Sequence, residues 1–116
     1  MTEEEDNLEI RATHEQDGSL VQLTGEIDLR TSPQLRSTFL ELIQRKPRRI
    51  ILDLSGVSYV DSSGVGTIVE LKRRTMREAC KVVLVGLQSR VRSLFEITRL
   101  DNFFIITDSI DEAWQA

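Results

Sequence analysis

At residues 58–66 the chain reads Ser58-Tyr59-Val60-Asp61-Ser62-Ser63-Gly64-Val65-Gly66. Before this stretch lies a short apolar run, Ile50–Leu54, which is typical of a buried strand. After it, apolar side chains recur at helical spacing through Val65, Ile68, Val69 and Met76. The stretch is therefore predicted to join a strand to a helix at the C-terminal edge of a sheet, where open α/β sheets usually meet ligands and partners.

The polar residues of this corner exceed what a helix start needs. Serine and aspartate are favoured at helix starts because their oxygens accept hydrogen bonds from free backbone N–H groups. One such side chain is enough for a cap. Two serines, Ser62 and Ser63, therefore leave one hydroxyl for another use.

The pattern on either side predicts a single domain over residues 8–116, preceded by a polar, acidic tail over residues 1–7. Strands are expected at 8–15, 20–24, 50–54, 81–85 and 103–106. Tight turns are expected at Asp17-Gly18 and around Gly56, and the chain should leave its second strand at Gly25.

Helix boundaries follow from capping residues and prolines. Helices are expected from Thr31-Ser32-Pro33 to Pro47, from 62 to 78, from Ser89, and from Asp108 or Ser109. The resulting order is β-β-α-β-α-β-α-β-α. An opening hairpin followed by alternating strands and helices indicates the α/β class, with a mixed central β-sheet covered by helices.

Composition narrows the function further. The 116 residues are 40% apolar, which suits one small core, and no run is long enough to span a membrane. The net charge of −4 comes from Glu3-Glu4-Glu5-Asp6, because 19 acidic residues less these four equal the 15 basic ones. We therefore expect a cytoplasmic protein without direct nucleic-acid or membrane binding. The single cysteine, Cys80, is expected to be a semi-buried thiol without metal partners.

Three chemistries fit the corner poorly. A serine nucleophile needs a base, and the only histidine, His14, is expected near the turn of the first hairpin as an exposed residue. Gly64-Val65-Gly66 lacks the lysine and hydroxyl of a phosphate-binding loop. A phospho-acceptor aspartate, Asp53 or Asp61, would need further carboxylates for magnesium. We therefore expect neither an enzyme nor a metal or cofactor site.

The fourth possibility is a serine that another protein modifies. A phosphate on Ser62 would add about 1.5 to 2 negative charges at a helix N-terminus, which tolerates such charge. The fold would change little, whereas a docked partner would be repelled, the more so because Asp28 and Asp61 already make the site acidic. The alternative, in which Ser62 is only a helix cap, stays open from residue types alone.

The chain from Leu8 onward resembles a STAS domain of the bacterial anti-sigma factor antagonist type. The resemblance rests on five blocks in order: Leu23-Thr24-Gly25-Glu26-Ile27-Asp28, Thr31, Ile51-Leu52-Asp53-Leu54-Ser55, Tyr59-Val60-Asp61-Ser62-Ser63-Gly64-Val65-Gly66 and Val91-Arg92-Ser93-Leu94-Phe95. It implies a non-enzymatic protein that binds an anti-sigma factor, itself a serine kinase, and so frees a sigma factor.

The resemblance also implies roles for individual residues. Ser62 would be the phosphorylation site, and Ser63 its neighbour or the helix cap. Asp28, in the loop after the second strand, would hydrogen-bond or position the acceptor hydroxyl, and Asp61 would shape the corner. Thr31 and Gly64 complete the expected acceptor environment.

The resemblance implies partners as well. The kinase would bring ATP and magnesium, and a phosphoserine phosphatase would reset the switch. A monomer or weak dimer is expected. The alternative within the family is a non-switching subunit of a stressosome-type or membrane lipid-transport complex.

Overall fold

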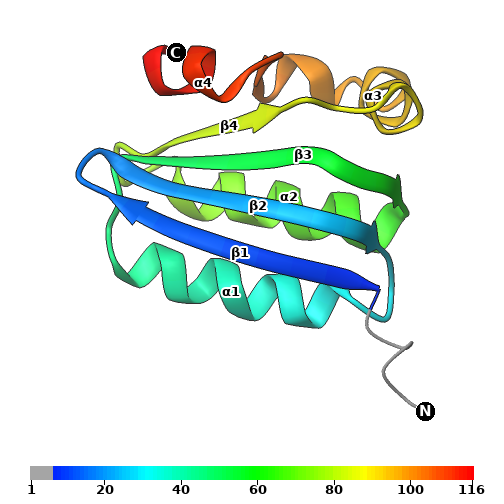
Figure 1. Ribbon diagram of the computed structural model, residues 1–116, viewed down its shortest axis with the longest axis horizontal. Coiled ribbons are helices and arrows are strands. Elements are labelled where there is room, and N and C mark those ends of the chain that lie inside the picture. The colour runs from blue at the N-terminus through cyan, green and yellow to red at the C-terminus, as the bar shows by residue number, and fades with distance from the viewer. Residues whose placement is uncertain (1–6) are drawn as a thin grey trace.

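The structure is a computed structural model that describes residues 7–116. The predicted acidic tail therefore lies outside the described residues, except for Asn7. The chain alternates as predicted (Figure 1), and its elements are β1 (Leu8–Glu15), β2 (Gly18–Ile27), α1 (Ser32–Gln44), β3 (Arg49–Val60), α2 (Ser62–Thr75), β4 (Lys81–Val85), α3 (Ser89–Ile97), the short 3₁₀ helix η2 (Leu100–Asn102), β5 (Ile105–Thr107) and α4 (Ile110–Gln115). The predicted α/β class and element order are confirmed.

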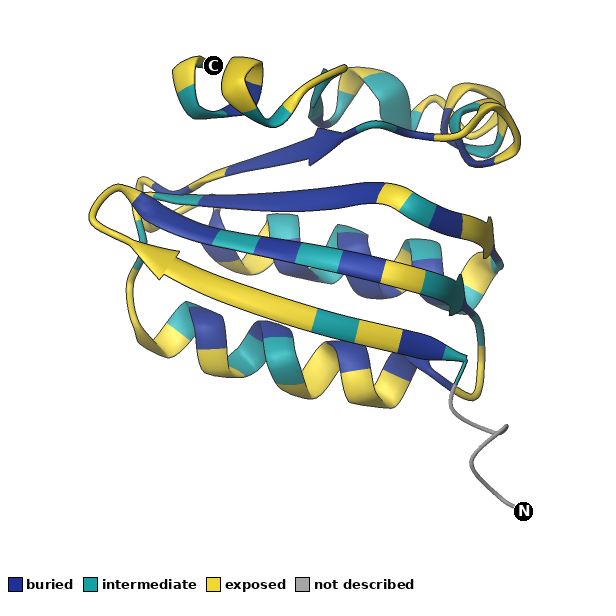
Figure 2. Ribbon diagram, viewed as in Figure 1, coloured by how far each residue is buried: buried dark blue, intermediate teal, exposed yellow. Residues whose placement is uncertain are grey.

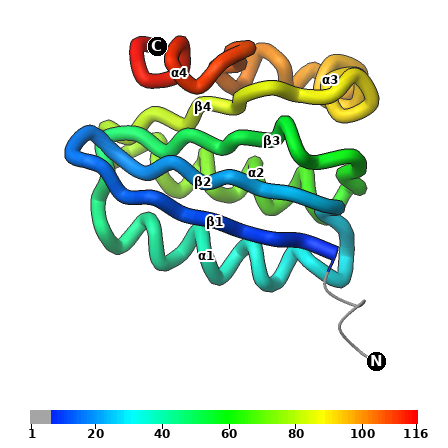
Figure 3. The backbone as a smooth tube through the Cα atoms, viewed as in Figure 1, coloured from blue at the N-terminus to red at the C-terminus, as the bar shows by residue number. Residues whose placement is uncertain are grey.

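The five strands lie in the sheet in the order β1-β2-β3-β4-β5. The hairpin pair β1 and β2 is antiparallel, while β2, β3, β4 and β5 run parallel to one another. The sheet is therefore mixed, as an opening hairpin followed by β-α-β units requires. The parallel strands all end at the same edge, and the tube in Figure 3 shows β2 and β3 reaching that edge side by side.

Helices pack on both faces of the sheet. The larger core joins α1, α2 and α3 to the inner side chains of β2, β3 and β4, and includes Leu35, Ile68 and Phe95. A smaller core on the other face is closed by Ala113 of α4 against Ile51 and other strand residues. Figure 2 shows the central strands largely buried and β1 largely exposed. Burial of these apolar side chains is the main stabilising contribution to the fold.

Two predicted strand ends are wrong. β2 does not stop at Gly25 but continues to Ile27, and the expected turn at Gly56 is absent because β3 runs on to Val60. The pairing of β2 with β3 shifts register twice, between Gln22 and Thr24 and again between Gly25 and Glu26. At each shift β3 has one residue more than β2, as in a β-bulge, and β3 continues past Gly56 still paired with β2.

Smaller differences concern helix and strand ends. Helix α2 ends at Thr75 rather than residue 78, and Met76 is 60% exposed instead of packing on the core. The last strand spans Ile105–Thr107, because Phe104 is buried among the core aromatics before the strand begins. Ser89 begins α3 but does not cap it, whereas Ser109 caps α4 by accepting from the Glu112 N–H.

An ion-pair network ties α1 to α2. Arg36 of α1 donates two hydrogen bonds, of 2.9 and 3.0 Å, to the carboxylate of Glu70, which also accepts from Arg74 at 3.0 Å. The Arg36 hydrogen bonds, with smaller help from Arg74, outweigh partial burial and lower the pKa of Glu70 from 4.5 to about 2.

Acid should therefore weaken this link between the helices. A carboxylate whose folded pKa is lowered adds stability above its unfolded pKa and loses it as pH falls towards the folded value. Between pH 4.5 and about 2, the free energy of unfolding should fall further for the wild type than for Glu70→Gln. The difference should stay below about 1 kcal/mol because the side chains are partly exposed. Urea unfolding of both proteins at pH 7, 4 and 2.5 measures this difference. An equal loss of unfolding free energy in the two proteins as the pH falls would contradict the prediction.

Candidate functional site

The predicted corner forms where β2 and β3 end next to each other. The backbone N–H of Asp61 donates to the carbonyl of Ile27 at 3.0 Å, which joins the ends of the two strands. Helix α2 begins at the next residue, Ser62. Gly64, in its first turn, lies so close to the sheet that an added Cβ would stand 2.6 Å from the Ile27 side chain and 2.8 Å from its carbonyl oxygen. Only glycine admits this approach of the helix start to the strands.

Asp61 is the cap of α2 and the hub of the corner. Its carboxylate Oδ1 accepts from the Gly64 N–H at 3.0 Å and from the Ser63 hydroxyl at 2.6 Å. Its Oδ2 accepts from the Leu29 N–H at 3.2 Å, so the loop after β2 is tied to the helix start. Partial burial raises the pKa of Asp61, but these hydrogen bonds together outweigh it and lower the pKa below the usual value. Asp61 is thus anionic at neutral pH.

Of the two roles expected for Ser63, the helix cap and the neighbour of the acceptor, the structure does not contain the first, because Asp61 is the cap. Besides donating to Asp61, the Ser63 hydroxyl lies 3.1 Å from the hydroxyl of Ser32, the first residue of α1. Ser63 therefore links the starts of the two helices. Ser32, in turn, donates to the backbone carbonyl of Asp28 at 2.7 Å. The sequence pattern did not identify Ser32 as part of the site, because its contact is made only after α1 and α2 are packed together.

Ser62 differs from Asp61 and Ser63 in that its side chain takes no part in the hydrogen bonds of the corner. It is the first residue of α2 and is exposed to solvent. Within residues 7–116 its hydroxyl makes no hydrogen bond. Asp61 is the cap of α2, so the alternative in which Ser62 is only a helix cap is wrong. The structure thus presents an accessible, unengaged hydroxyl at the positive end of a helix.

Asp28 does not hold the Ser62 hydroxyl. Its carboxylate accepts from the backbone N–H groups of Arg30 and Thr31, at 2.9 and 3.2 Å, and lies 3.5 Å from the Arg30 guanidinium. This is a local turn in which an aspartate side chain binds the backbone that follows it. No hydrogen bond joins Asp28 to Ser62 in the described residues, so the expected direct contact is absent. Asp28 instead shapes the loop over residues 28–31.

Thr31 holds that loop to the end of β2 through its hydroxyl group. It is buried, its hydroxyl donates to the Glu26 carbonyl at 2.9 Å, and the same oxygen accepts from the Asp28 N–H at 2.9 Å. Thr31 therefore precedes α1 without capping it by its side chain, contrary to expectation, whereas Pro33 occupies the first turn as expected. Being buried, Thr31 acts on the site through the loop and not through direct contact with a partner.

Two segments that meet at the corner carry exposed apolar side chains. Leu29, whose N–H binds Asp61, is 75% exposed, and Tyr59 of β3 is 46% exposed. Beside Tyr59 is a hollow of about 230 Å³. Its lining comes from the end of β3 and from α3, namely Ser58, Tyr59, Val60, Arg90, Val91 and Leu94. Apolar groups exposed around a polar centre are typical of protein-binding surfaces.

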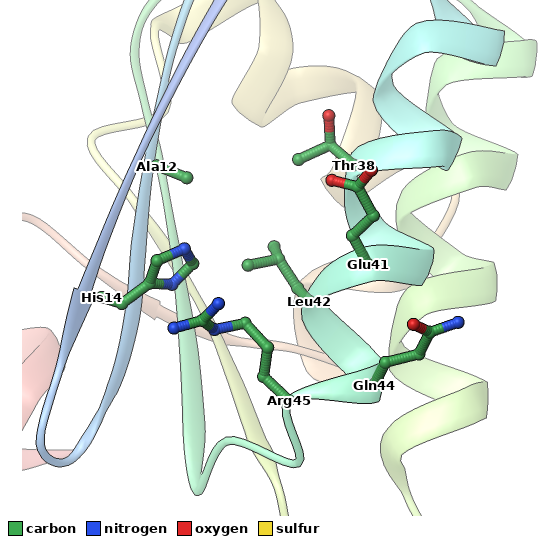
Figure 4. Close-up of a pocket in the computed structure, with 7 residues that line it drawn as sticks. All are labelled: Ala12, His14, Thr38, Glu41, Leu42, Gln44 and Arg45. Carbon is green, nitrogen blue, oxygen red and sulfur yellow. The ribbon is translucent and has the colours of Figure 1, made fainter.

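His14 lies at the opposite end of the sheet from Ser62. It pairs with Ser19, which in turn pairs with Ile50 near the start of β3, whereas Ser62 follows the end of β3. Ten strand residues separate those ends by roughly 30 Å. His14 is exposed, as predicted, and faces a hollow of about 460 Å³ between β1 and α1 (Figure 4). A serine nucleophile at Ser62 with His14 as base is therefore excluded.

The described residues offer no reactive thiol and no cluster of metal-binding side chains. Cys80 is buried, and this burial raises the pKa of its thiol to about 11, so it stays protonated and unreactive at neutral pH. In the part of the chain that the structure describes, no three histidine, cysteine, aspartate or glutamate side chains cluster to hold a metal ion. None of the described helices is long and apolar enough to cross a membrane.

Comparison with known proteins gives consistent results. The sequence model of the STAS domain matches residues 9–113. The anti-sigma-B factor antagonist of Staphylococcus aureus is 30% identical over 105 residues, which are 90% of this chain and 97% of that protein. Relatives of this name are regulatory proteins rather than enzymes.

Solved structures share the fold. An anti-sigma factor antagonist from Mycobacterium paratuberculosis superposes with a TM-score of 0.87 at 24% identity, covering 95% of this chain and 93% of its own. SpoIIAA is similar in its unphosphorylated form, with a TM-score of 0.80, 23% identity, and coverage of 90% and 92%. Its phosphorylated form, from Bacillus, has a TM-score of 0.74, 22% identity, and coverage of 92% and 97%.

Proposed function

The chain belongs to the STAS domain family, and from that premise we propose that it is an anti-sigma factor antagonist switched by phosphorylation at Ser62. In its unphosphorylated form it binds an anti-sigma factor that is also a serine kinase, and this binding releases a sigma factor. Phosphorylation of Ser62 ends the interaction, and a phosphoserine phosphatase restores it. The protein is the kinase's substrate and ligand, not an enzyme.

One observation carries this proposal: Ser62 has an exposed hydroxyl with no hydrogen bond in residues 7–116. Both neighbouring polar side chains are engaged, because Asp61 caps α2 and Ser63 binds Asp61 and Ser32. A kinase can therefore reach and modify Ser62 without breaking a contact that the fold needs. The names of the relatives and the existence of SpoIIAA in both phosphorylation states support the same assignment.

Electrostatics explain how a phosphate would switch binding off. The added charge would stand next to the anionic Asp61, with Asp28 in the neighbouring loop. The N-terminal end of α2 accommodates negative charge, so the domain itself stays folded. A partner docked on the same surface would instead face the phosphate together with Asp61, whereas Asp28 is partly compensated by Arg30, and a carboxylate on the partner would be repelled at close range.

The proposed phosphorylation assigns different roles to the kinase and to this chain. The kinase supplies ATP, magnesium and the catalytic base, and this chain supplies the acceptor hydroxyl and the surface around it. We place the protein in the cytoplasm, where a sigma factor and its regulators act, without direct contact with nucleic acid or membrane. The exposed Ser62 favours this assignment over a non-switching subunit of a stressosome-type or lipid-transport complex, in which the serine would stay unmodified.

Peptide mass spectrometry of the protein from its native cells tests the proposal. We expect a phosphate on Ser62 whose occupancy differs between quiescent and stressed cells, and none on Ser63. Affinity purification of the Ser62→Ala variant should retain a soluble ATP-binding serine kinase. A Ser62 that stays unmodified under all conditions, together with retention of a membrane ATPase, would favour the assembly-subunit alternative and overturn the switch.

The apolar residue beside the acceptor should matter for binding. Leu29→Ser should weaken capture of the kinase about tenfold or more, because Leu29 is an exposed apolar residue in the loop that is bound to Asp61, and docking at the corner would bury it. Met76→Ser is the matched control: Met76 is similarly exposed, at 60%, but follows the far end of α2, about 20 Å from Ser62. Equal losses in the two variants, measured by calorimetry with the purified kinase, would argue against docking at Leu29.

A further inference from the structure

The outer edge of β1 is a long, regular strand edge. Within residues 7–116 β1 pairs only with β2, and it is the first strand in the sheet order. It has eight residues, no proline and no shift in its register, whereas the opposite edge strand, β5, has three residues. Such an edge presents backbone N–H and C=O groups that a further strand can bind.

The side of β1 that faces the helices is incompletely covered. Leu8 is buried and Ile10 is half-buried, but the next inward residues, Ala12 and His14, are exposed. Beyond them the hollow of about 460 Å³ separates β1 from α1, with the buried Leu42 among its lining residues (Figure 4). A strand added beside β1 would extend the sheet along α1 and cover part of this hollow.

We propose that β1 pairs with β1 of a second copy of this chain to form an antiparallel, two-fold symmetric dimer. Antiparallel pairing of identical strands is closed, because each copy offers the same edge once. A residue whose backbone groups point outward must face another outward residue, so the pairing has to be centred on a residue and not between two residues. Only the choice of that central residue remains.

Charge and apolar contact together favour Ile10 as the centre. With Ile10 opposite Ile10 of the second copy, Glu9 lies opposite Arg11, and the symmetry repeats this ion pair. Centring on Glu9 or on Arg11 would place like charges opposite each other, and centring on Ala12 would place Glu9 opposite Glu15. Centring on Thr13 would pair Arg11 with Glu15, but Ile10 would then lie opposite Gln16 of the turn and lose its apolar neighbour. Within one chain Glu9 and Arg11 already form an exposed ion pair at 3.7 Å, with side chains 68% and 72% accessible. In the dimer the two pairs would lie side by side with their charges alternating, so each side chain would gain a second opposite charge from the other copy. Opposite charges directly across a strand pair stabilise it, and like charges destabilise it.

Side-chain size agrees with the same register. Leu8 of one copy lies opposite Ala12 of the other, so a large side chain faces a small one at both ends of the pairing. Ile10, half-buried in the monomer, gains an apolar neighbour across the two-fold axis. The corner stays accessible, because Ser62 follows β3 and β3 is separated from the dimer edge by β2 and β1. The proposed pairing therefore uses no residue of the corner.

Sedimentation equilibrium of the full chain over a wide concentration range tests the dimer. The wild type should show reversible monomer–dimer exchange. Glu9→Arg and Arg11→Glu should each raise the dissociation constant about tenfold or more, because each creates two like-charge pairs per dimer. The double variant Glu9→Arg/Arg11→Glu should return to within about threefold of the wild type, since it restores both pairs. Asp111→Arg, an equal charge change on an exposed residue of α4, should have no effect.

Each other outcome overturns the proposal. A wild type that stays monomeric at millimolar concentration excludes the dimer. A dimer that Glu9→Arg leaves intact uses a different surface, and single variants that dissociate without rescue by the double variant exclude the register centred on Ile10. Circular dichroism of every variant confirms folding, which these exposed substitutions should preserve. None of these readouts depends on a kinase, so failure here leaves the proposed function untouched.

Discussion

Ser62→Asp should lose binding to the anti-sigma factor kinase while unfolding at the same temperature as the wild type. The substitution places a negative charge at the first residue of α2, one residue after the anionic Asp61. Repulsion and the cost of desolvating the new charge should weaken binding by about 100-fold, or roughly 3 kcal/mol. The fold should be unaffected, because the Ser62 hydroxyl makes no hydrogen bond in the described chain and a helix N-terminus favours anions.

Ser62→Ala is the matched control for this result. It removes the acceptor hydroxyl without adding charge, so binding should stay within about twofold of the wild type while phosphorylation is abolished. Isothermal titration with the purified kinase measures the first property, and incorporation of radioactive phosphate measures the second. Affinity of the wild type should also fall with added salt, as expected for a partly polar interface. A Ser62→Asp protein that binds normally would remove the basis of the switch, and one that unfolds would make Ser62 structural.

Gly64→Ala should destabilise the domain by about 1–3 kcal/mol, the usual cost of overpacking. An alanine Cβ at this position would lie 2.6 Å from Ile27 Cγ2, 2.8 Å from the Ile27 carbonyl oxygen and 2.9 Å from Val60 Cγ1. Two of these atoms belong to buried side chains and the third is backbone, so none can move freely. The start of α2 must therefore shift away from β2 and β3, which strains the hydrogen bond from the Asp61 N–H to Ile27.

Gly66→Ala provides the opposite result on the same helix. No atom lies within 4 Å of a Cβ at Gly66, which is exposed. Replacing glycine by alanine inside a helix should then stabilise the protein by about 0.5–1 kcal/mol. Denaturant unfolding of the two variants should thus move in opposite directions from the wild type. Similar destabilisation by both substitutions would mean that the effect of Gly64→Ala on the free energy of unfolding does not arise from the close contact of α2 with the strands.

Local patterns were sufficient to predict the class and order of the fold. Apolar runs identified the central strands, and cap residues with prolines identified the helix starts, as Pro33 and Ser109 illustrate. These features depend on residues close in sequence, so they can be recognised without knowing what lies beside them in space. The same reasoning, together with the resemblance, predicted that a strand and a helix meet at Asp61, Ser62, Ser63 and Gly64.

Tertiary structure decided the rest. Gly56 suggested a turn, but it lies within β3, where a Cβ would stand 2.9 Å from the Leu23 carbonyl of β2. A glycine required for close approach to another strand cannot be distinguished from a turn glycine by its neighbours in sequence. Met76 fitted the apolar spacing of α2, yet the helix ends before it and leaves it exposed.

The site itself shows the same division. The sequence by itself determined that hydroxyls and carboxylates gather where β3 meets α2. Which of them is free depended on packing: Asp61 takes the cap, Ser63 binds across to Ser32, and Asp28 folds onto its own loop, so Ser62 alone is left unengaged. Hydrogen bonds between residues about 30 positions apart form only when β2, β3 and both helix starts are brought together, and local pattern carries no information about that distance.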